Sequence, residues 1–225
     1  DGCMHEWSPS MDARTPVTSP TPARLRWLIL AAMLVVLIMA PLDASAVNII
    51  LPVLQADFHL GLAQVAWVSL AYLVMLASFI LPIGRLGDLF GFRQFYLAGA
   101  AVFTLASLGC AVAPNFPLLI VARIAQAMGA CMLMAISPGI TTAIFPAQER
   151  GRGLGAVSMA VAIGSAIGPS LGGFLTALGG WRLVFLINLP LGLLGSVACY
   201  FLLPKIRPHP GRRVDWQGGL LGMLM

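Results

Sequence analysis

The chain has 225 residues, of which 59% are apolar and only 9% are charged, against roughly 25% charged in an ordinary soluble domain. Thirteen basic and eight acidic residues are too few to cover a water-facing globule of this size, because uncovered apolar patches associate. We therefore expect lipid to cover most of the surface. The net charge of +5 does not indicate a nucleic-acid-binding protein, since long stretches of the chain carry no charge at all.

The sequence also argues against a metal site and against an enzyme. Its four cysteines form no C-x-x-C pair, so neither a zinc site nor a disulfide framework is predicted. The three histidines lie in polar connections, and no nucleophile, base or metal-ligand cluster converges. The glycines at 151, 153 and 155 follow no predicted strand, which excludes a nucleotide-binding loop.

In chain order, a proline-, serine- and threonine-rich segment over residues 1–26 predicts a disordered tail. At the other end of the chain, the sequence predicts a loop over 204–215 and the start of a seventh helix over 216–225. Because that helix is cut short, we expect the chain to be part of a longer protein. Each of the six apolar runs between the tail and the loop has about the 20 residues that a bilayer core requires. The runs lie at 27–51, 65–83, 94–113, 117–144, 154–177 and 183–203.

The runs predict an all-α, polytopic membrane helical bundle over residues 27–203, with six complete transmembrane helices. An alternative for the first run is a signal peptide, because Arg24 and Arg26 precede it and residues 44–46 resemble a cleavage site. Eleven of the thirteen basic residues fall in the tail and alternate loops, while the opposite loops hold only Arg182. The positive-inside rule then predicts a cytoplasmic N-terminus in a multi-pass protein of the cell (inner or plasma) membrane.

Asp43 and Arg123 are the ionisable residues deep inside the runs, where a charge costs at least about 2.5 to 3.5 kcal/mol. At 1.5 Å per residue, both lie roughly 9 to 12 Å from the outer face. We predict that they face one polar cavity and are electrostatically coupled, with Asp43 taking up and releasing a proton. The alternative is a permanent ion pair that only fixes helix packing. Asp43 lies in the first helix of the first three, and Arg123 lies in the first helix of the second three. A 3+3 inverted repeat would place them in this way.

Two segments resemble a known family. The first run is similar to the first-helix motif of the drug:proton antiporters of the major facilitator superfamily, through Leu42, Asp43, Ser45, Asn48, Leu51 and Pro52. Residues 84–93 resemble the signature cytoplasmic loop of that superfamily, although Leu89 and Phe92 stand where the family usually has basic residues. As a gate loop, it has Gly84 and Gly91 for close helix approach and a tight turn. Asp88 is expected to bond Arg93 or the N-terminal end of a nearby helix.

Two later runs extend the resemblance. Arg123, Gln126 and Gly129 resemble the family's proton-transfer motif, with Ala127 in place of a usual glycine. Residues 164–173 closely resemble the antiporter motif, which uptake symporters generally lack. Its glycines let backbones meet, and its proline removes one amide hydrogen bond; generic small-residue packing is the alternative. The motif residues of this segment are Gly164, Gly168, Pro169, Gly172 and Gly173.

The sixth run and the residues near the C-terminus resemble the fourteen-span branch of these antiporters. The residues that carry this likeness are Trp181, Arg182, Phe185, Asn188, Pro190 and Gly192, with Asp215, Trp216, Gly218 and Gly219 after the short loop. The chain is thus identified as the N-terminal half of a member of that branch.

The resemblance implies proton-coupled efflux of small amphipathic or cationic compounds by alternating access, as in multidrug antiporters. It implies no cofactor, with the proton gradient as the energy source, and as partners membrane lipid, a small-molecule substrate, protons and the missing C-terminal half. Asp43 would be a proton acceptor or a contact for cationic substrates. Alternatives are a proton-coupled uptake carrier of the same superfamily and a transport-inactive truncated fragment. We expect the substrate cavity to be lined by Asn48, Gln126 and Met128, with Met132 and Met134.

Overall fold

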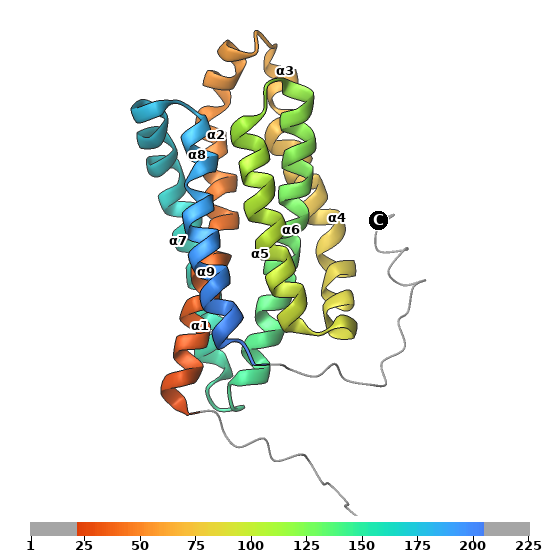
Figure 1. Ribbon diagram of the computed structural model, residues 1–225, viewed down its shortest axis with the longest axis vertical. Coiled ribbons are helices and arrows are strands. Elements are labelled where there is room, and N and C mark those ends of the chain that lie inside the picture. Colours follow the sequence, from red (N-terminus) through yellow and green to blue (C-terminus); the bar gives the residue numbers. More distant parts are fainter. Residues whose placement is uncertain (1–21, 205–225) are drawn as a thin grey trace, which may run out of the picture.

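The computed structural model describes residues 22–204, apart from the side chains of residues 88–90. Within these residues every regular element is a helix, which confirms the predicted all-α class (Figure 1). The helices are α1 (Ala23–Leu37), α2 (Met39–Asp57), α3 (Leu62–Val65), α4 (Trp67–Phe90), α5 (Phe92–Val112), α6 (Phe116–Ile144), α7 (Arg150–Gly179), α8 (Arg182–Leu186) and α9 (Asn188–Leu202).

These helices make six segments that are long and apolar enough to cross a membrane, as the six runs predict. Three of the segments join two helices each: α1 with α2, α3 with α4, and α8 with α9. Helix α1 begins at Ala23, so residues 23–26, which we assigned to the tail, belong to the first segment. The rest of that tail, the predicted loop after residue 204 and the start of a seventh helix lie outside the described residues.

Proline explains two of the interruptions within these segments. Helix α1 gives way to α2 at Ile38 and α8 gives way to α9 at Ile187, in each case three residues before a proline, Pro41 or Pro190. A proline has no amide hydrogen, so the carbonyl four residues earlier loses its helical partner at that turn. The first and sixth segments are therefore each divided into two helices.

The tight connections use glycine where the backbone requires it. Gly91 has φ of 96° between α4 and α5, and Gly180 has φ of 83° between α7 and α8. Residues with a side chain rarely adopt this left-handed region, so both positions favour glycine. The described chain crosses the bundle six times, and its two ends lie at the same end of the molecule (Figure 1).

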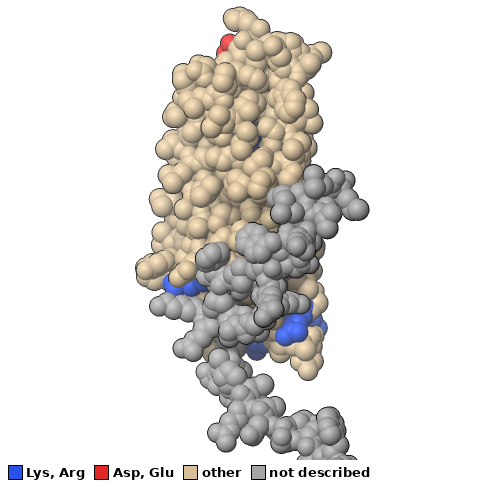
Figure 2. All heavy atoms as spheres, turned by 90° about the vertical axis from the view of Figure 1, so that its right-hand side faces the viewer, with Lys and Arg blue, Asp and Glu red and all other residues tan. Residues whose placement is uncertain are grey.

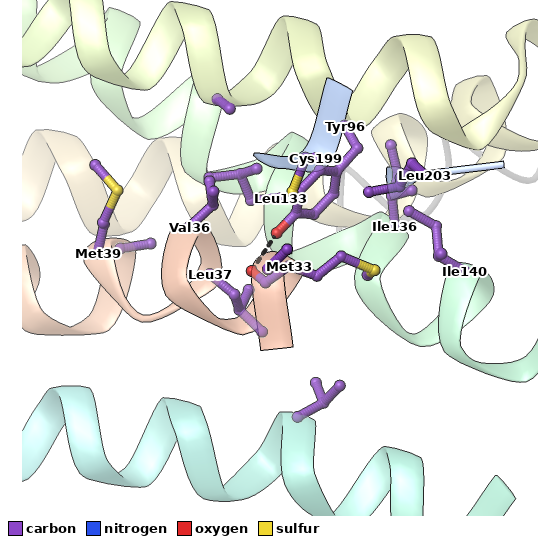
Figure 3. Packing of buried hydrophobic residues seen from close by; sticks show 14 of the residues in the cluster. Met33, Val36, Leu37, Met39, Tyr96, Leu133, Ile136, Ile140, Cys199 and Leu203 are labelled. Carbon is purple, nitrogen blue, oxygen red and sulfur yellow. Dashed lines mark hydrogen bonds between the residues drawn. The ribbon is translucent and has the colours of Figure 1, made fainter. Parts of the chain in front are cut away.

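The helices pack most extensively in three pairs, α5 with α6, α2 with α7, and α4 with α6, and α9 lies against α1 and α5. Two clusters of buried apolar residues fill the interior. Figure 3 shows part of the first cluster, in which the Tyr96 hydroxyl donates a hydrogen bond of 2.7 Å to the Met33 carbonyl. The second cluster surrounds Ile50, Val68 and Phe185.

The outer surface is apolar along the middle of the bundle. Figure 2 shows a broad, largely uncharged band, with most of the arginines of that view gathered near one end. Large apolar side chains are exposed on the described helices, among them Leu105, Leu194 and Phe201, each at least 68% exposed. In water such a surface would associate, whereas lipid tails cover it without cost, so the surface agrees with a membrane-embedded bundle.

Candidate functional site

A layer of buried polar residues lies between the two apolar clusters. On α2, Ala40 belongs to the first cluster and Ala46 to the second, with Asp43 between them. On α6, Ala127 and Ala122 flank Arg123 in the same way. A buried polar group is tolerated only where hydrogen bonds replace its contacts with water, so this layer has to be satisfied from within the bundle.

Three side chains donate hydrogen bonds to the carboxylate of Asp43, which is fully buried. Arg123 Nη1 donates to Oδ2 in a direct ion pair. Gln126 Nε2 and Asn188 Nδ2 each donate to Oδ1 at 3.0 Å. The donors come from α6 and α9, so the charge on α2 is held by two other membrane segments.

Arg123 is 1% exposed, and its guanidinium contacts groups on several helices. Besides its bond to Asp43, Nη1 donates to Gln126 Oε1 at 2.6 Å, and Nε donates to the Val68 carbonyl at 3.2 Å. The guanidinium carbon also lies 4.5 Å from the centre of the Tyr72 ring. Such a planar, multiply bonded cation is what a guanidinium provides and an ammonium does not.

Ser107 of α5 closes the network. Its Oγ accepts from Gln126 Nε2 at 2.8 Å and from Asn188 Nδ2 at 3.4 Å, and it donates to the Phe103 carbonyl at 2.8 Å. The Cys110 thiol lies 3.7 Å from Gln126 Oε1. Helices α2, α4, α5, α6 and α9 thus all contribute to the surroundings of one ion pair, which makes the network depend on their relative positions.

A cavity of about 310 Å³ borders this network. Arg123 reaches its wall, but Asp43 is not among the residues that line it. Its polar wall is made of hydroxyl and amide groups from several helices, and Asn48 there accepts a hydrogen bond of 2.9 Å from Ser69. The lining residues are Ala40, Pro41, Ala44, Ser45, Asn48, Ser69, Tyr72, Leu73, Leu76, Arg123, Met134, Val161 and Ser165.

The residues expected at the cavity fall into two groups. Asn48 and Met134 line it. Gln126 instead belongs to the buried network, where both ends of its amide are engaged. Neither Met128 nor Met132 is among the lining residues. The sequence did not separate the two groups, because a polar residue in an apolar run indicates a polar neighbour but not which one.

The glycine stripe of α7 lies against α2. A Cβ added to Gly164 would come within 2.9 Å of the Ile38 carbonyl, and one added to Gly172 within 2.9 Å of the Ala46 carbonyl. At Gly168 it would overlap Ser45 Oγ. A Cβ added to Gly173 would make only an ordinary contact, 3.9 Å from Ile49, and α7 continues as a helix through Pro169. The stripe lets two backbones meet directly, as small residues do in membrane bundles.

In the loop between α4 and α5, the positive φ of Gly91 makes the expected tight turn. A Cβ added to Gly84 would lie at an ordinary 3.7 Å from the Cβ of Ala135 in α6. Arg93 donates a hydrogen bond of 2.5 Å to the Tyr200 carbonyl near the end of α9, and its guanidinium stacks 5.2 Å from that ring. The side chain of Asp88 lies outside the described residues, so its pairing with Arg93 or a helix end stays a prediction.

An ion pair lies near each end of the bundle. Trp181 Nε1 donates a hydrogen bond of 2.8 Å to Asp57 Oδ2, and Arg182 lies 3.7 Å from the same oxygen. At the other end, Arg26 of α1 pairs with Glu149 at 3.5 Å, just before α7. Each pair ties the first segment to a connection next to a distant helix.

Comparison with known proteins identifies the family. The sequence profile of the Major Facilitator Superfamily matches residues 33–222. The chain belongs to the Major Facilitator Superfamily. Solved structures have the same fold. A bacterial homolog of the human lysosomal transporter Spinster, inward-facing and occupied, aligns with a TM-score of 0.73 at 21% identity, over 85% of this chain and 48% of that one. The proton:xylose symporter XylE aligns with a TM-score of 0.72 at 17% identity, over 82% and 46%.

Curated superfamily relatives are similar in sequence as well. An uncharacterized MFS-type transporter of Mycobacterium tuberculosis is 42% identical over 87% of this chain and 34% of its own length. The riboflavin transporter RibZ of Clostridioides difficile is 37% identical over 87% and 43%. The multidrug resistance protein Stp of M. tuberculosis is 38% identical over 82% and 35%. The chain therefore spans less than half the length of these superfamily transporters.

Sequence reasoning did not place Tyr72, Ser107 or Asn188 at the ion pair of this superfamily bundle, although Asn188 contributed to the resemblance to the fourteen-span branch. None of them is charged at neutral pH, so none carries the cost that marks a lone acid or base in a membrane segment. Asn188 does stand out as an amide inside the sixth apolar run. A search for buried amides and hydroxyls near the depth of Asp43 would have found it.

Proposed function

We propose that this chain forms the N-terminal half of a proton-coupled exporter of small amphipathic or cationic compounds, a multidrug-type antiporter that works by alternating access. A second half completes the cavity, and the proton gradient supplies the energy without a cofactor. Relatives named multidrug resistance proteins support the assignment, as does the glycine stripe that joins α7 to α2.

One observation carries this proposal: the buried ion pair of Asp43 and Arg123 lies beside the cavity, and Arg123 belongs to both. A proton on Asp43 removes the charge that holds the guanidinium, while Gln126 Oε1 and the Val68 carbonyl still accept from it. The guanidinium is then free to shift toward the cavity that it already lines. The protonation state of Asp43 thereby changes the position of Arg123 in the cavity wall that a substrate contacts, as coupled transport requires.

Asp43→Asn tests the coupling. In inside-out vesicles containing the full transporter that includes this half, the variant should insert normally but lose substrate transport driven by a pH gradient. The matched control is Asp57→Asn, which removes the other acid of α2, a half-exposed residue at the helix end; it should retain transport. Full proton-driven transport by Asp43→Asn would contradict the proposal.

A second candidate is a proton-coupled uptake carrier of the same superfamily. One relative is named a riboflavin transporter, and that name does not say whether the compound is imported or exported. The direction of flux separates the two candidates. Under an inward proton gradient, an exporter moves the substrate against the direction of the protons, and an uptake carrier moves it with them.

We also propose that the protein lies in the cell (inner or plasma) membrane with its N-terminus in the cytoplasm. The described end that carries Arg85, Arg93, Arg150 and Arg152 is the basic one, and the opposite end carries Arg182. Reporter fusions to the N-terminus test this orientation: a fused phosphatase that is active only outside the cytoplasm should stay inactive, and an active fusion would refute it.

A further inference from the structure

One polar atom of the buried network has no partner. Among the described residues, Asn188 Oδ1 is a buried side-chain oxygen that accepts no hydrogen bond, although the residue is fully buried. The same amide donates through Nδ2 to Asp43 Oδ1 at 3.0 Å and to Ser107 Oγ at 3.4 Å. A buried acceptor left without a donor is costly and therefore uncommon, so this atom calls for an explanation.

The charge on Asp43 fixes the orientation of the amide. With the amide turned over, Oδ1 of Asn188 would face Oδ1 of the carboxylate, and two acceptors would meet without a hydrogen between them. An ionised Asp43 thus forces Nδ2 inward and leaves Oδ1 unpartnered. When Oδ1 of Asp43 carries a proton, the preference reverses, because the carboxyl group then has an O–H to donate.

Gln126, the other amide at Asp43 Oδ1, is not free to turn in this way. Its Oε1 accepts from Arg123 Nη1 at 2.6 Å, and its Nε2 donates to Ser107 Oγ at 2.8 Å as well as to Asp43. Turning it over would break the bond from Arg123. Turning Asn188 breaks only the bonds of its own Nδ2, since nothing donates to its oxygen.

We propose that Asn188 is a positioning residue that responds to the proton on Asp43: its amide donates to the ionised carboxylate and turns over to accept from the protonated one. This inference rests on the proton uptake at Asp43 in the proposed function. No covalent bond between the residues forms or breaks; the proton stays on Asp43 Oδ1, and its O–H donates to Asn188 Oδ1.

Asn188 links the protonation of Asp43 to the sixth membrane segment, because it lies where that segment is interrupted. Asn188 is the first residue of α9, directly after the interruption at Ile187. The ring of Phe185, on the other side of that interruption, lies 5.7 Å from the guanidinium carbon of Arg123. Both sides of the interruption therefore contact the ion pair, one through an amide and the other through an aromatic ring.

Other titratable groups also face this site. Arg123 comes from α6, Tyr72 from α4 and Cys110 from α5. Free arginine, tyrosine and cysteine side chains all lose their protons at higher pH than a free carboxyl group. The variant Cys110→Ser serves as a control that removes the thiol, and the response of Asn188 should persist in it.

The chain itself makes the experiment selective, because it contains three asparagines, Asn48, Asn115 and Asn188. With ¹⁵N introduced by segmental labelling into the asparagine side-chain amides of this half alone, the full transporter in lipid nanodiscs gives three asparagine NH₂ signals. Substitutions at Asn48 and Asn115 assign the third by elimination, so no variant at 188 is needed. Asn115 is the reference, since its oxygen caps α6 by accepting from the Leu118 amide at 3.0 Å.

We expect the Asn188 signal to shift with pH along a single-proton curve that follows the carboxyl band of Asp43, and to stay fixed in Asp43→Asn. The Asn115 signal should stay fixed in both proteins, which shows that the variant is folded. The infrared band of a protonated carboxyl group, identified by its absence from Asp43→Asn, is followed in the same samples.

The two measurements separate the possible failures. If the carboxyl band of Asp43 titrates and the Asn188 signal does not follow it, the role of Asn188 is refuted and the proposed proton coupling stands. If the band does not change with pH while the protein stays folded, the proton coupling is refuted, and the role of Asn188 with it. A shift of Asn188 that persists in Asp43→Asn also refutes the role, because another group would then be its cause.

Discussion

The contact between α2 and α7 allows a graded test of packing. Along α7 the space available to a new methyl group differs from one glycine to the next. A Cβ at Gly155 would meet nothing within 4 Å, and one at Gly173 would lie 3.9 Å from Ile49. At Gly168 it would lie 2.6 Å from the Leu42 carbonyl and overlap the Ser45 hydroxyl. Alanine substitutions therefore compare sites on one helix that differ mainly in free space.

The expected free energies follow from two opposing effects. Alanine is favoured over glycine inside a helix by about 0.5 to 1 kcal/mol, because it restricts the unfolded chain. Overpacking costs about 1 to 3 kcal/mol, and the upper part of that range applies to Gly168, since the Leu42 carbonyl belongs to a helix backbone. Gly155→Ala should thus raise the free energy of unfolding slightly, and Gly168→Ala should lower it by about 2 kcal/mol.

Thermal unfolding in detergent micelles, followed by circular dichroism, gives the order of stability. We expect Gly155→Ala and Gly173→Ala to be slightly more stable than the unsubstituted protein, and Gly168→Ala to be the least stable. Adding Ser45→Ala to Gly168→Ala should recover part of the loss, because the hydroxyl is removed but the Leu42 carbonyl stays. Equal stability of Gly168→Ala and Gly155→Ala would refute the direct backbone contact.

Two further predictions concern the charged contacts. Arg123→Leu should lower the free energy of unfolding, measured by chemical unfolding, by about 3 to 5 kcal/mol, because it leaves Asp43 charged and buried. Adding Asp43→Asn should recover part of this loss. No recovery in the double variant would contradict the pairing. At the opposite end, Trp181→Phe should cost about 1 kcal/mol through its lost bond to the half-exposed Asp57. Arg182→Gln should cost less, since that pair is long and solvent-screened, and the reverse order would refute this ranking.

The six membrane segments could be predicted from the sequence because each had to be apolar over the full thickness of a bilayer. Their interruptions could not. A proline removes the same hydrogen bond everywhere, yet only some prolines interrupt a helix, depending on how the neighbouring helices hold the chain. Pro41 and Pro190 follow interruptions, whereas Pro52, Pro82, Pro138 and Pro169 lie within continuous helices.

The candidate site was predictable in depth but not in detail. Counting residues along two helices places Asp43 and Arg123 at one level, and the structure brings them into contact. Which uncharged groups surround them depends on how each helix is rotated about its axis. Segments that are apolar on nearly all sides give little indication of this rotation, and so the sequence did not place Ser107 and Asn188 at the ion pair.

The position of the ion pair also favours one of the two roles expected for Asp43. Its carboxylate accepts three hydrogen bonds and is absent from the wall of the cavity, whereas Arg123 reaches that wall. A substrate in the cavity therefore meets a guanidinium together with hydroxyl and amide groups. A cation in the cavity would gain no direct contact with the acid. The geometry thus favours Asp43 as the proton acceptor, acting on the substrate through Arg123, over Asp43 as the binding site of a cationic substrate.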